Sequence, residues 1–129
     1  KKAKMLKEKL GCDHVIRYKE EDVAAELKKL APDGLDVILE GVGGGMLQTA
    51  LDCLAQKGRL LQIGYISEYP HNPEAETETS KNEIDAADIF WNKKTIRRGD
   101  QIIYGNAWPS DFSTVEGSKD RVLRLFAEK

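Results

Sequence analysis

The chain has 129 residues, 40% of them hydrophobic and 33% charged, and its 20 basic and 22 acidic residues leave a net charge of −2. This length suits one small domain, and the near-neutral charge does not indicate a nucleic-acid-binding protein. No run approaches the ~20 apolar residues of a membrane span, and no basic segment leads into an apolar stretch as in a secretory leader. Two cysteines are too few for a disulfide scaffold and fit a reducing compartment, so we expect a cytoplasmic protein.

Helical and extended segments are expected to alternate in the first third of the chain. Residues 1–10 are rich in helix formers, and Gly11 follows them in a position typical of a helix C-terminus. Residues 14–18 predict a short strand, and Asp22 can cap a helix that covers residues 23–30. Because the chain starts and stops inside helical patterns, we expect it to be part of a longer protein.

The middle of the chain predicts a parallel sheet. The apolar run 35–39 indicates a strand buried on both faces, residues 46–56 a helix, and residues 59–64 another apolar strand. A strand–helix–strand–helix–strand order with short connections favours parallel pairing through right-handed crossovers. The predicted fold class is therefore α/β, with half of a doubly wound parallel sheet.

The alternation is less regular after residue 64. The polar segment 67–82 contains two prolines and predicts a surface loop. A helix is expected over residues 84–91, a strand over 95–104, and a final helix over most of 111–129.

The glycine-rich turn over residues 41–45 is the first candidate ligand site. It follows a predicted strand, and ligands of open parallel sheets bind at the carboxyl ends of strands. Its spacing does not match the dinucleotide motif G-x-G-x-x-G, because Met46 or Gln48 stands where the third glycine is needed. A tight turn without a ligand explains these glycines equally well.

A second candidate site lies at residues 64–67, after the next strand. Alone it favours a simple strand-ending turn, but the two strand ends would share one crevice if the strands are neighbours. His14 and His71 are isolated, and no Cys/His spacing resembles a zinc site, so we expect no metal.

Three stretches occur in an order and spacing that a known family shares. They are KLGCD (9–13) with VIRYK (15–19), LDVILEGVGG (35–44), and KGRLLQIGYIS (57–67). Here the sequence resembles the medium-chain dehydrogenase/reductase superfamily, in particular its zinc-independent NADPH reductases: quinone oxidoreductases, 2-alkenal reductases and prostaglandin reductases. The resemblance implies a Rossmann-like sheet that lacks its first βαβ unit. The phosphate-binding loop belongs to that unit and would be missing with it. Residues 1–129 would be the C-terminal two-thirds of a nucleotide-binding domain and the start of the closing segment, and the substrate domain would be absent.

The resemblance also implies an NADP cofactor. Lys2 and Tyr18 stand where family members bind the 2′-phosphate, and an ammonium and a phenol suit a dianion. Gly41 replaces an Asn or Ser of many relatives, so any contact there comes from the backbone. The implied cofactor-binding residues are Lys2, Tyr18, Gly41, Val42, Gly43, Ile63, Gly64, Tyr65, Ile66, Ser67, Gln101, Ile102 and Ile103. Candidates for the pocket and the substrate side are Tyr69, Asn106 and Trp108.

By the same resemblance, the protein is expected to transfer a hydride from NADPH to an activated alkene or a quinone, so the substrate is a small enal, enone or quinone. No catalytic residue is identified in this chain, and the fragment alone is expected to be inactive. The family's late strands often pair across a dimer axis, which implies a homodimer through the strand over 95–104.

Two alternatives stay open. The domain could be a catalytically inactive Rossmann-fold interaction module, which the departure at Gly41 and the unusual segment 97–101 favour. It could also be a methyltransferase-like domain that binds S-adenosylmethionine. Lys2 and Tyr18 argue against the methyltransferase, because that cofactor carries no phosphate for them to bind.

Overall fold

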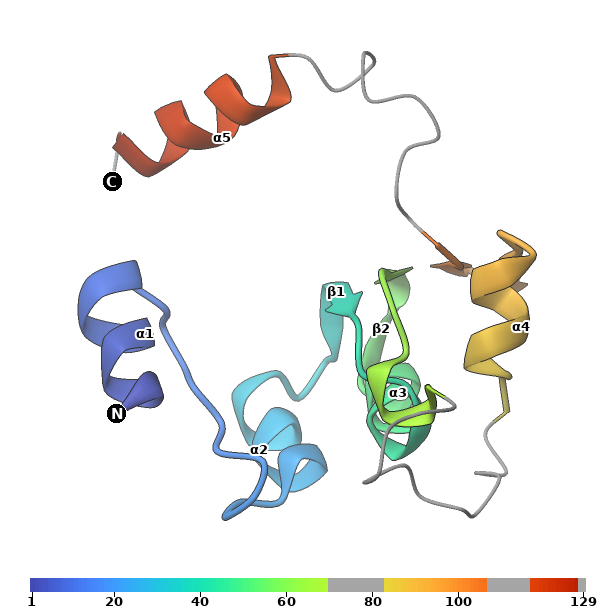
Figure 1. Ribbon diagram of the computed structural model, residues 1–129. Helices are drawn as coiled ribbons and strands as arrows, with labels where there is room; N and C mark the ends of the chain where they lie inside the picture. Colours follow the sequence, from blue (N-terminus) through green and yellow to red (C-terminus); the bar gives the residue numbers. More distant parts are fainter. Residues whose placement is uncertain (70–82, 107–116, 128–129) are drawn as a thin grey trace.

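The computed structural model describes residues 1–69, 83–106 and 117–127 (Figure 1). In chain order the elements are α1 (Lys2–Leu10), α2 (Val23–Leu30), β1 (Leu35–Glu40), α3 (Gly44–Asp52), β2 (Leu54–Gln62), the 3₁₀ helix η1 (Ile66–Glu68), α4 (Ala86–Trp91), β3 (Thr95–Arg98), β4 (Gln101–Tyr104) and α5 (Ser118–Ala127). Within the described ranges, no helix combines the length and the apolar character that crossing a membrane requires.

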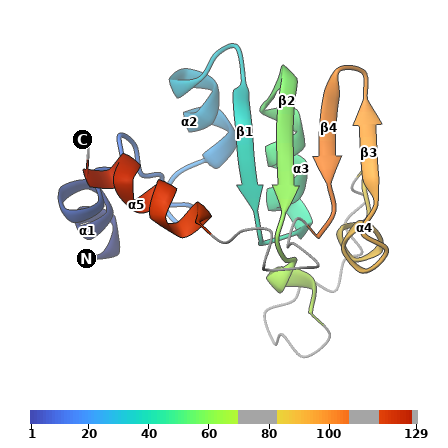
Figure 2. The same ribbon diagram turned by 90° about the horizontal axis from the view of Figure 1, so that it is seen from above.

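The four strands form one sheet in the order β1-β2-β4-β3 (Figure 2). β1, β2 and β4 are parallel, and α3 makes the crossover between β1 and β2, as the sequence predicts. β3 is antiparallel to β4. The single strand predicted over 95–104 is therefore wrong: Gly99, at φ +60°, lets the chain reverse and splits the segment into a hairpin.

The strand predicted over 14–18 is also wrong, since these residues adopt no regular extended pairing and run into a turn at Tyr18. In this turn the N–H groups of Glu20 and Glu21 both donate to the Arg17 carbonyl, at 2.7 and 2.9 Å. Extended backbone needs a neighbouring strand for its polar groups, and among the described residues none lies beside this segment.

The burial expected for residues 35–39 holds for one face of β1 only. Val37 and Leu39 are 66% and 67% exposed, whereas Ile38 packs on the hydrophobic core. Alternate residues of a strand face opposite sides, and Ile38 packs against the cluster that contains residues of α3. α3 covers one side of the sheet (Figure 1). α3 ends at Asp52 rather than at residue 56, because Leu54 already pairs with Leu35.

Both predicted helix ends in the first third of the chain are confirmed. Gly11 adopts a left-handed conformation at φ +67° after α1. The Asp22 carboxylate accepts the Ala25 N–H at 3.0 Å at the start of α2. The last helix begins at Ser118, and residues 111–116 of its expected range lie outside the described residues.

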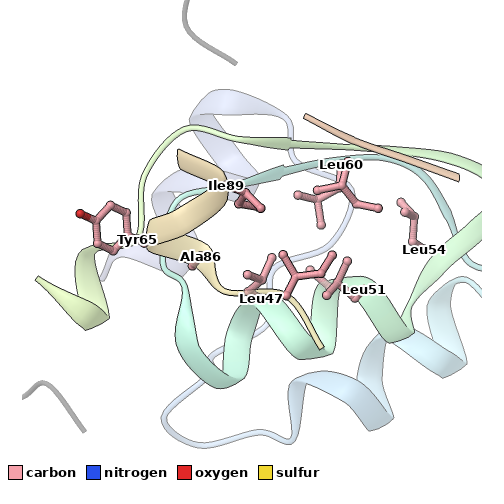
Figure 3. Packing of buried hydrophobic residues seen from close by; sticks show 10 residues of the cluster. Leu47, Leu51, Leu54, Leu60, Tyr65, Ala86 and Ile89 are labelled. Carbon is pink, nitrogen blue, oxygen red and sulfur yellow. The ribbon is translucent and has the colours of Figure 1, made fainter. Parts of the chain in front are cut away.

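The hydrophobic core lies on one side of the sheet, between the strands and helices α3 and α4 (Figure 3). Leu47 and Leu51 of α3, Leu60 of β2 and Ile103 of β4 are fully buried there, and Ile89 of α4 is 1% exposed. Burying each such side chain contributes about 1.5–3 kcal/mol. This packing holds the carboxyl ends of β1 and β2 in place. In both views α1 and α5 lie beyond β1, away from the core (Figures 1 and 2).

Candidate functional site

The carboxyl ends of β1 and β2 meet, so the two turns predicted to share a crevice are side by side. The Ile66 N–H donates to the Gly41 carbonyl at 3.2 Å, and the Ser67 N–H donates to the Val42 carbonyl at 2.9 Å. The Ser67 hydroxyl also donates to the Val42 carbonyl, at 2.6 Å. We call residues 40–44 and 63–68 together the strand-end site.

Two acidic side chains, Glu40 and Glu68, hold the first turn of the strand-end site from opposite ends. Glu40 Oε1 accepts the backbone N–H groups of Val42, at 2.7 Å, and Gly43, at 2.9 Å. The Glu68 carboxylate accepts the Gly44 N–H. These N–H groups would otherwise point at an anion in front of α3. Because these N–H groups already donate to side chains of the protein, the turn does not present them to a phosphate as a phosphate-binding loop does. This agrees with its glycine spacing.

The structure explains two of the glycines by close approach between the turns. Gly43 has φ +77° and ψ −162°, and a Cβ there would lie 2.8 Å from Glu68 Oε1 and 2.9 Å from Tyr65 Cβ. A Cβ on Gly64 would lie 3.3 Å from the Gly41 carbonyl oxygen. Contact between the turns thus requires small residues at these positions, with or without a ligand.

Glu40 is the one charged residue among the described residues that is buried, at 3% exposure. Burial raises the pKa of the Glu40 carboxyl above its ordinary value. The N–H groups of Gly43 and Val42 oppose the rise in this pKa, and the neighbouring Glu68 carboxylate adds to it.

An aromatic cluster borders the strand-end site on the side of α4. The Tyr65 ring packs edge-on against Tyr69 at 4.6 Å and against Phe90 at 5.4 Å between ring centroids. Trp91 Nε1 donates to the Tyr65 hydroxyl at 2.5 Å. Tyr65 is buried, and packing explains why an aromatic side chain stands there. Tyr69 and Trp91 are 39% and 70% exposed and are accessible to a ligand.

The predicted site residues of β4 are not at this end of the sheet. Ile102 pairs with Arg59 and Ile103 with Leu60, so both lie in mid-sheet. Gln101 begins β4, and its amide donates to the carbonyls of Leu54 and Ala55, at the start of β2, at 2.8 and 3.0 Å. Gln101 therefore lies at the opposite end of β2 from residues 63–67, because β4 runs parallel to β2. Asn106 follows the carboxyl end of β4 by two residues.

Lys2 and Tyr18 are both exposed, Lys2 on α1 and Tyr18 in the turn after it, and no described contact joins either to the strand-end site. The described residues contain no group of three or more His, Cys, Asp or Glu side chains placed to hold a metal ion. Trp108 and His71 lie outside the described residues.

Sequence reasoning missed three residues of this region. The sequence places Glu40 in the glycine-rich turn without giving its side chain a role, and it predicts Glu68 as part of a loop and Trp91 as part of a helix. No local pattern identifies Glu68 or Trp91, because Glu68 reaches Gly44 from 24 positions along the chain and Trp91 reaches Tyr65 from 26 positions. The partners of Glu40 on the turn are two and three residues away, but its burial depends on residues distant in the chain.

Known proteins with similar sequences match most of the chain. A family model described as zinc-binding dehydrogenase matches residues 1–116. Prostaglandin reductase-3 of Mus musculus is 51% identical over 129 residues, covering 98% of this chain and 31% of the relative. The NADP(+)-dependent 2-alkenal reductase of Nicotiana tabacum is 45% identical over 69 residues, covering 53% of this chain and 20% of the relative. These matches confirm the family resemblance.

A solved structure shares the fold. It is the crystal structure of CurA in complex with NADPH from Vibrio vulnificus, with a TM-score of 0.63 and 22% sequence identity. The match covers 98% of this chain and 35% of that chain. The chain therefore spans about a third or less of the length of these known proteins.

Proposed function

This chain belongs to the zinc-binding dehydrogenase family, and on that premise we propose that it is part of the cofactor domain of an NADPH-dependent reductase. The observation that carries the proposal is the strand-end site, where two glycine turns meet at the carboxyl edge of a parallel sheet. The reductases among the relatives, named for prostaglandin and 2-alkenal reduction, support the same activity. The substrate would be an enal, an enone or a quinone.

The residues of the strand-end site fit the sugar and ring of a nicotinamide better than they fit a phosphate. The N–H groups of Val42, Gly43 and Gly44 are already bonded to the side chains of Glu40 and Glu68. The turns therefore offer a compact surface of glycine backbone with the exposed side chain of Val42, and the exposed Tyr69 borders it. NADPH supplies the hydride when bound, and this chain contributes a surface that orients the cofactor and excludes water from it.

The phosphates of the cofactor need other partners. Lys2 and Tyr18 expose an ammonium and a phenol that suit the 2′-phosphate, and we assign them that role. The pyrophosphate loop would lie in a segment outside this chain, so residues 1–129 alone would bind NADPH weakly and would not catalyse the reaction.

The proposal extends to assembly and location. β3 is one of the two edge strands of the described sheet, with β4 as its neighbour, and its other edge would pair with β3 of a second copy. This pairing would give a homodimer. Cys12 and Cys53 are free thiols, which suits a reducing cytoplasm.

One observation favours a second function, an interaction module without catalysis. Gly41 offers no side chain, and the backbone donors around it are occupied within the protein. A domain retained only for its fold would show the same features.

Cofactor titration of the full-length protein, followed by nicotinamide fluorescence, tests the proposal. We expect tighter binding of NADPH than of NADH. Lys2→Ala and Tyr18→Phe should each weaken NADPH binding about tenfold or more, the size of one lost charge-assisted hydrogen bond, and leave NADH binding unchanged. Lys4→Ala, which changes another exposed lysine of α1, is the control and should bind both cofactors normally. If neither cofactor binds, the reductase is excluded in favour of the interaction module.

A further inference from the structure

Two buried side-chain oxygens in the described residues have no hydrogen-bond partner: Glu40 Oε2 and Gln62 Oε1. Glu40 is 3% exposed and Gln62 is fully buried. A buried polar atom left unpaired costs about 1–3 kcal/mol, and nearly all such atoms in native proteins have partners. Two unpaired oxygens next to a functional site therefore require a physical explanation.

The two residues are direct neighbours in the sheet. The register of β1 and β2 pairs Glu40 with Gln62. Paired residues of adjacent parallel strands project their side chains from the same face, with the strands about 4.8 Å apart. Both residues end their strands, so Glu40 belongs to the strand-end site and Gln62 directly precedes its second turn.

The other polar atoms of both side chains are already committed. Glu40 Oε1 accepts from Val42 and Gly43, and Gln62 Nε2 donates to the Ala86 carbonyl at 2.9 Å. Turning the Gln62 amide over would place its oxygen against the Ala86 carbonyl oxygen, so its orientation is determined. Two acceptor oxygens remain unpaired on adjacent side chains. With the Gln62 amide nitrogen bonded to Ala86, no hydrogen bond joins the two side chains as long as Glu40 is ionised.

A single proton satisfies both oxygens, since a neutral carboxyl group carries an O–H donor. We propose that Glu40 is a neutral carboxylic acid in the native protein, that its Oε2–H donates to Gln62 Oε1, and that Glu40 thereby acts as a positioning residue for the 41–43 turn. The hydrogen-bonded chain then runs from the turn through Glu40 and Gln62 to the first residue of α4.

The surroundings of Glu40 favour the proton. The charged group that acts on it from η1 is the Glu68 carboxylate, which repels a second negative charge. α3 presents the neutral glycines 44 and 45, and β2 presents the neutral Gln62. Burial raises the pKa of Glu40 in the same direction, against the opposing effect of the backbone N–H groups.

A consequence for the cofactor rests on the proposed function. Because the pKa of Glu40 is raised above its unfolded value, its stabilising effect is fully present below the unfolded pKa. It is lost as the pH rises through the folded pKa. Ionised Glu40 would face the Gln62 oxygen and Glu68 with a negative charge, and the turn that contacts NADPH would loosen. Cofactor affinity should therefore fall as the pH rises through the folded pKa of Glu40.

The proton itself can be tested without any cofactor, by infrared difference spectroscopy of the full-length protein against Glu40→Gln at neutral pH. We expect the parent to show the carbonyl band of a protonated carboxylic acid and the variant to lack it. Glu26→Gln, which removes a carboxylate ion-paired with Lys29, is the control and should leave the band unchanged. A parent without this band carries an ionised Glu40, and the proposal is then wrong. Absence of the band from the parent spectrum refutes the proposal even if the variant does not fold.

The positioning role is tested by the NADPH dissociation constant as a function of pH. In the parent it should rise by up to about tenfold per pH unit above the pKa of Glu40. Glu40→Gln keeps a donor to Gln62, so it should match the parent in mild acid and lose this pH dependence. Titration of the phosphate of NADPH affects the dissociation constants of the parent and of Glu40→Gln equally. The ratio of these two constants therefore removes that effect. A ratio that does not change with pH overturns the positioning role. If the acid band is present and NADPH does not bind at all, the Glu40–Gln62 pair stands and the reductase proposal fails.

Discussion

Gly43→Ala tests whether contact between the two turns, rather than a ligand, requires glycine in the strand-end site. Gly43 has φ +77° and ψ −162°, a region that essentially only glycine populates. The added methyl group would lie 2.8 Å from Glu68 Oε1 and 2.9 Å from Tyr65 Cβ. Tyr65 is 5% exposed and packed edge-on against two rings, so it has little room to move.

The expected loss of stability in Gly43→Ala follows from two contributions. Holding a residue other than glycine in this backbone conformation costs about 1–3 kcal/mol. The Glu68 side chain can move aside only by giving up the Gly44 N–H, a bond to a charged group that contributes about 1.5–3 kcal/mol. Because the backbone can relax in part, we expect Gly43→Ala to lower the free energy of unfolding by about 2–4 kcal/mol.

Urea unfolding followed by circular dichroism, with linear extrapolation to water, measures this loss. The matched control is Gly45→Ala in the first turn of α3, where a Cβ meets no atom within 4 Å. That change should be neutral or stabilise the protein by up to about 1 kcal/mol, because alanine suits a helix better than glycine. If Gly43→Ala is as stable as Gly45→Ala, contact between the turns does not require glycine, and the glycines would have to be explained by a ligand.

Two further predictions concern helix ends. Asp22→Ala removes the carboxylate that accepts the Ala25 N–H and should lower the free energy of unfolding by about 1 kcal/mol, whereas an unchanged urea midpoint would show that the cap contributes nothing. Arg98→Met removes the guanidinium that donates to the Leu51 carbonyl at the end of α3, to Gln101 and to Glu83. It should cost about 1–3 kcal/mol and speed amide hydrogen exchange in the β3–β4 hairpin. Its control, the exposed Arg97→Met, should change stability by less than about 0.5 kcal/mol, and equal losses in the two variants would contradict this role of Arg98.

Several features of this protein could be predicted from the sequence because they depend on residues close together in the chain. The cap at Asp22 spans three residues, and the left-handed end at Gly11 depends on one. The crossover from β1 through α3 to β2 follows from apolar periodicity and short connections. The glycine turns at both strand ends, and the family itself, were likewise visible in contiguous stretches of sequence.

Other features depend on which segments become neighbours, and only the tertiary structure decided them. The segment 14–18 has strand-like residues but no described partner, and the segment 95–104 pairs with itself as a hairpin. The register of β4 carries Gln101 to the start of β2, away from the strand-end site. The pairing of Glu40 with Gln62 arises in the same way. Whether a polar side chain is buried, and what it meets there, depends on residues distant in the chain, and local sequence patterns do not contain that information.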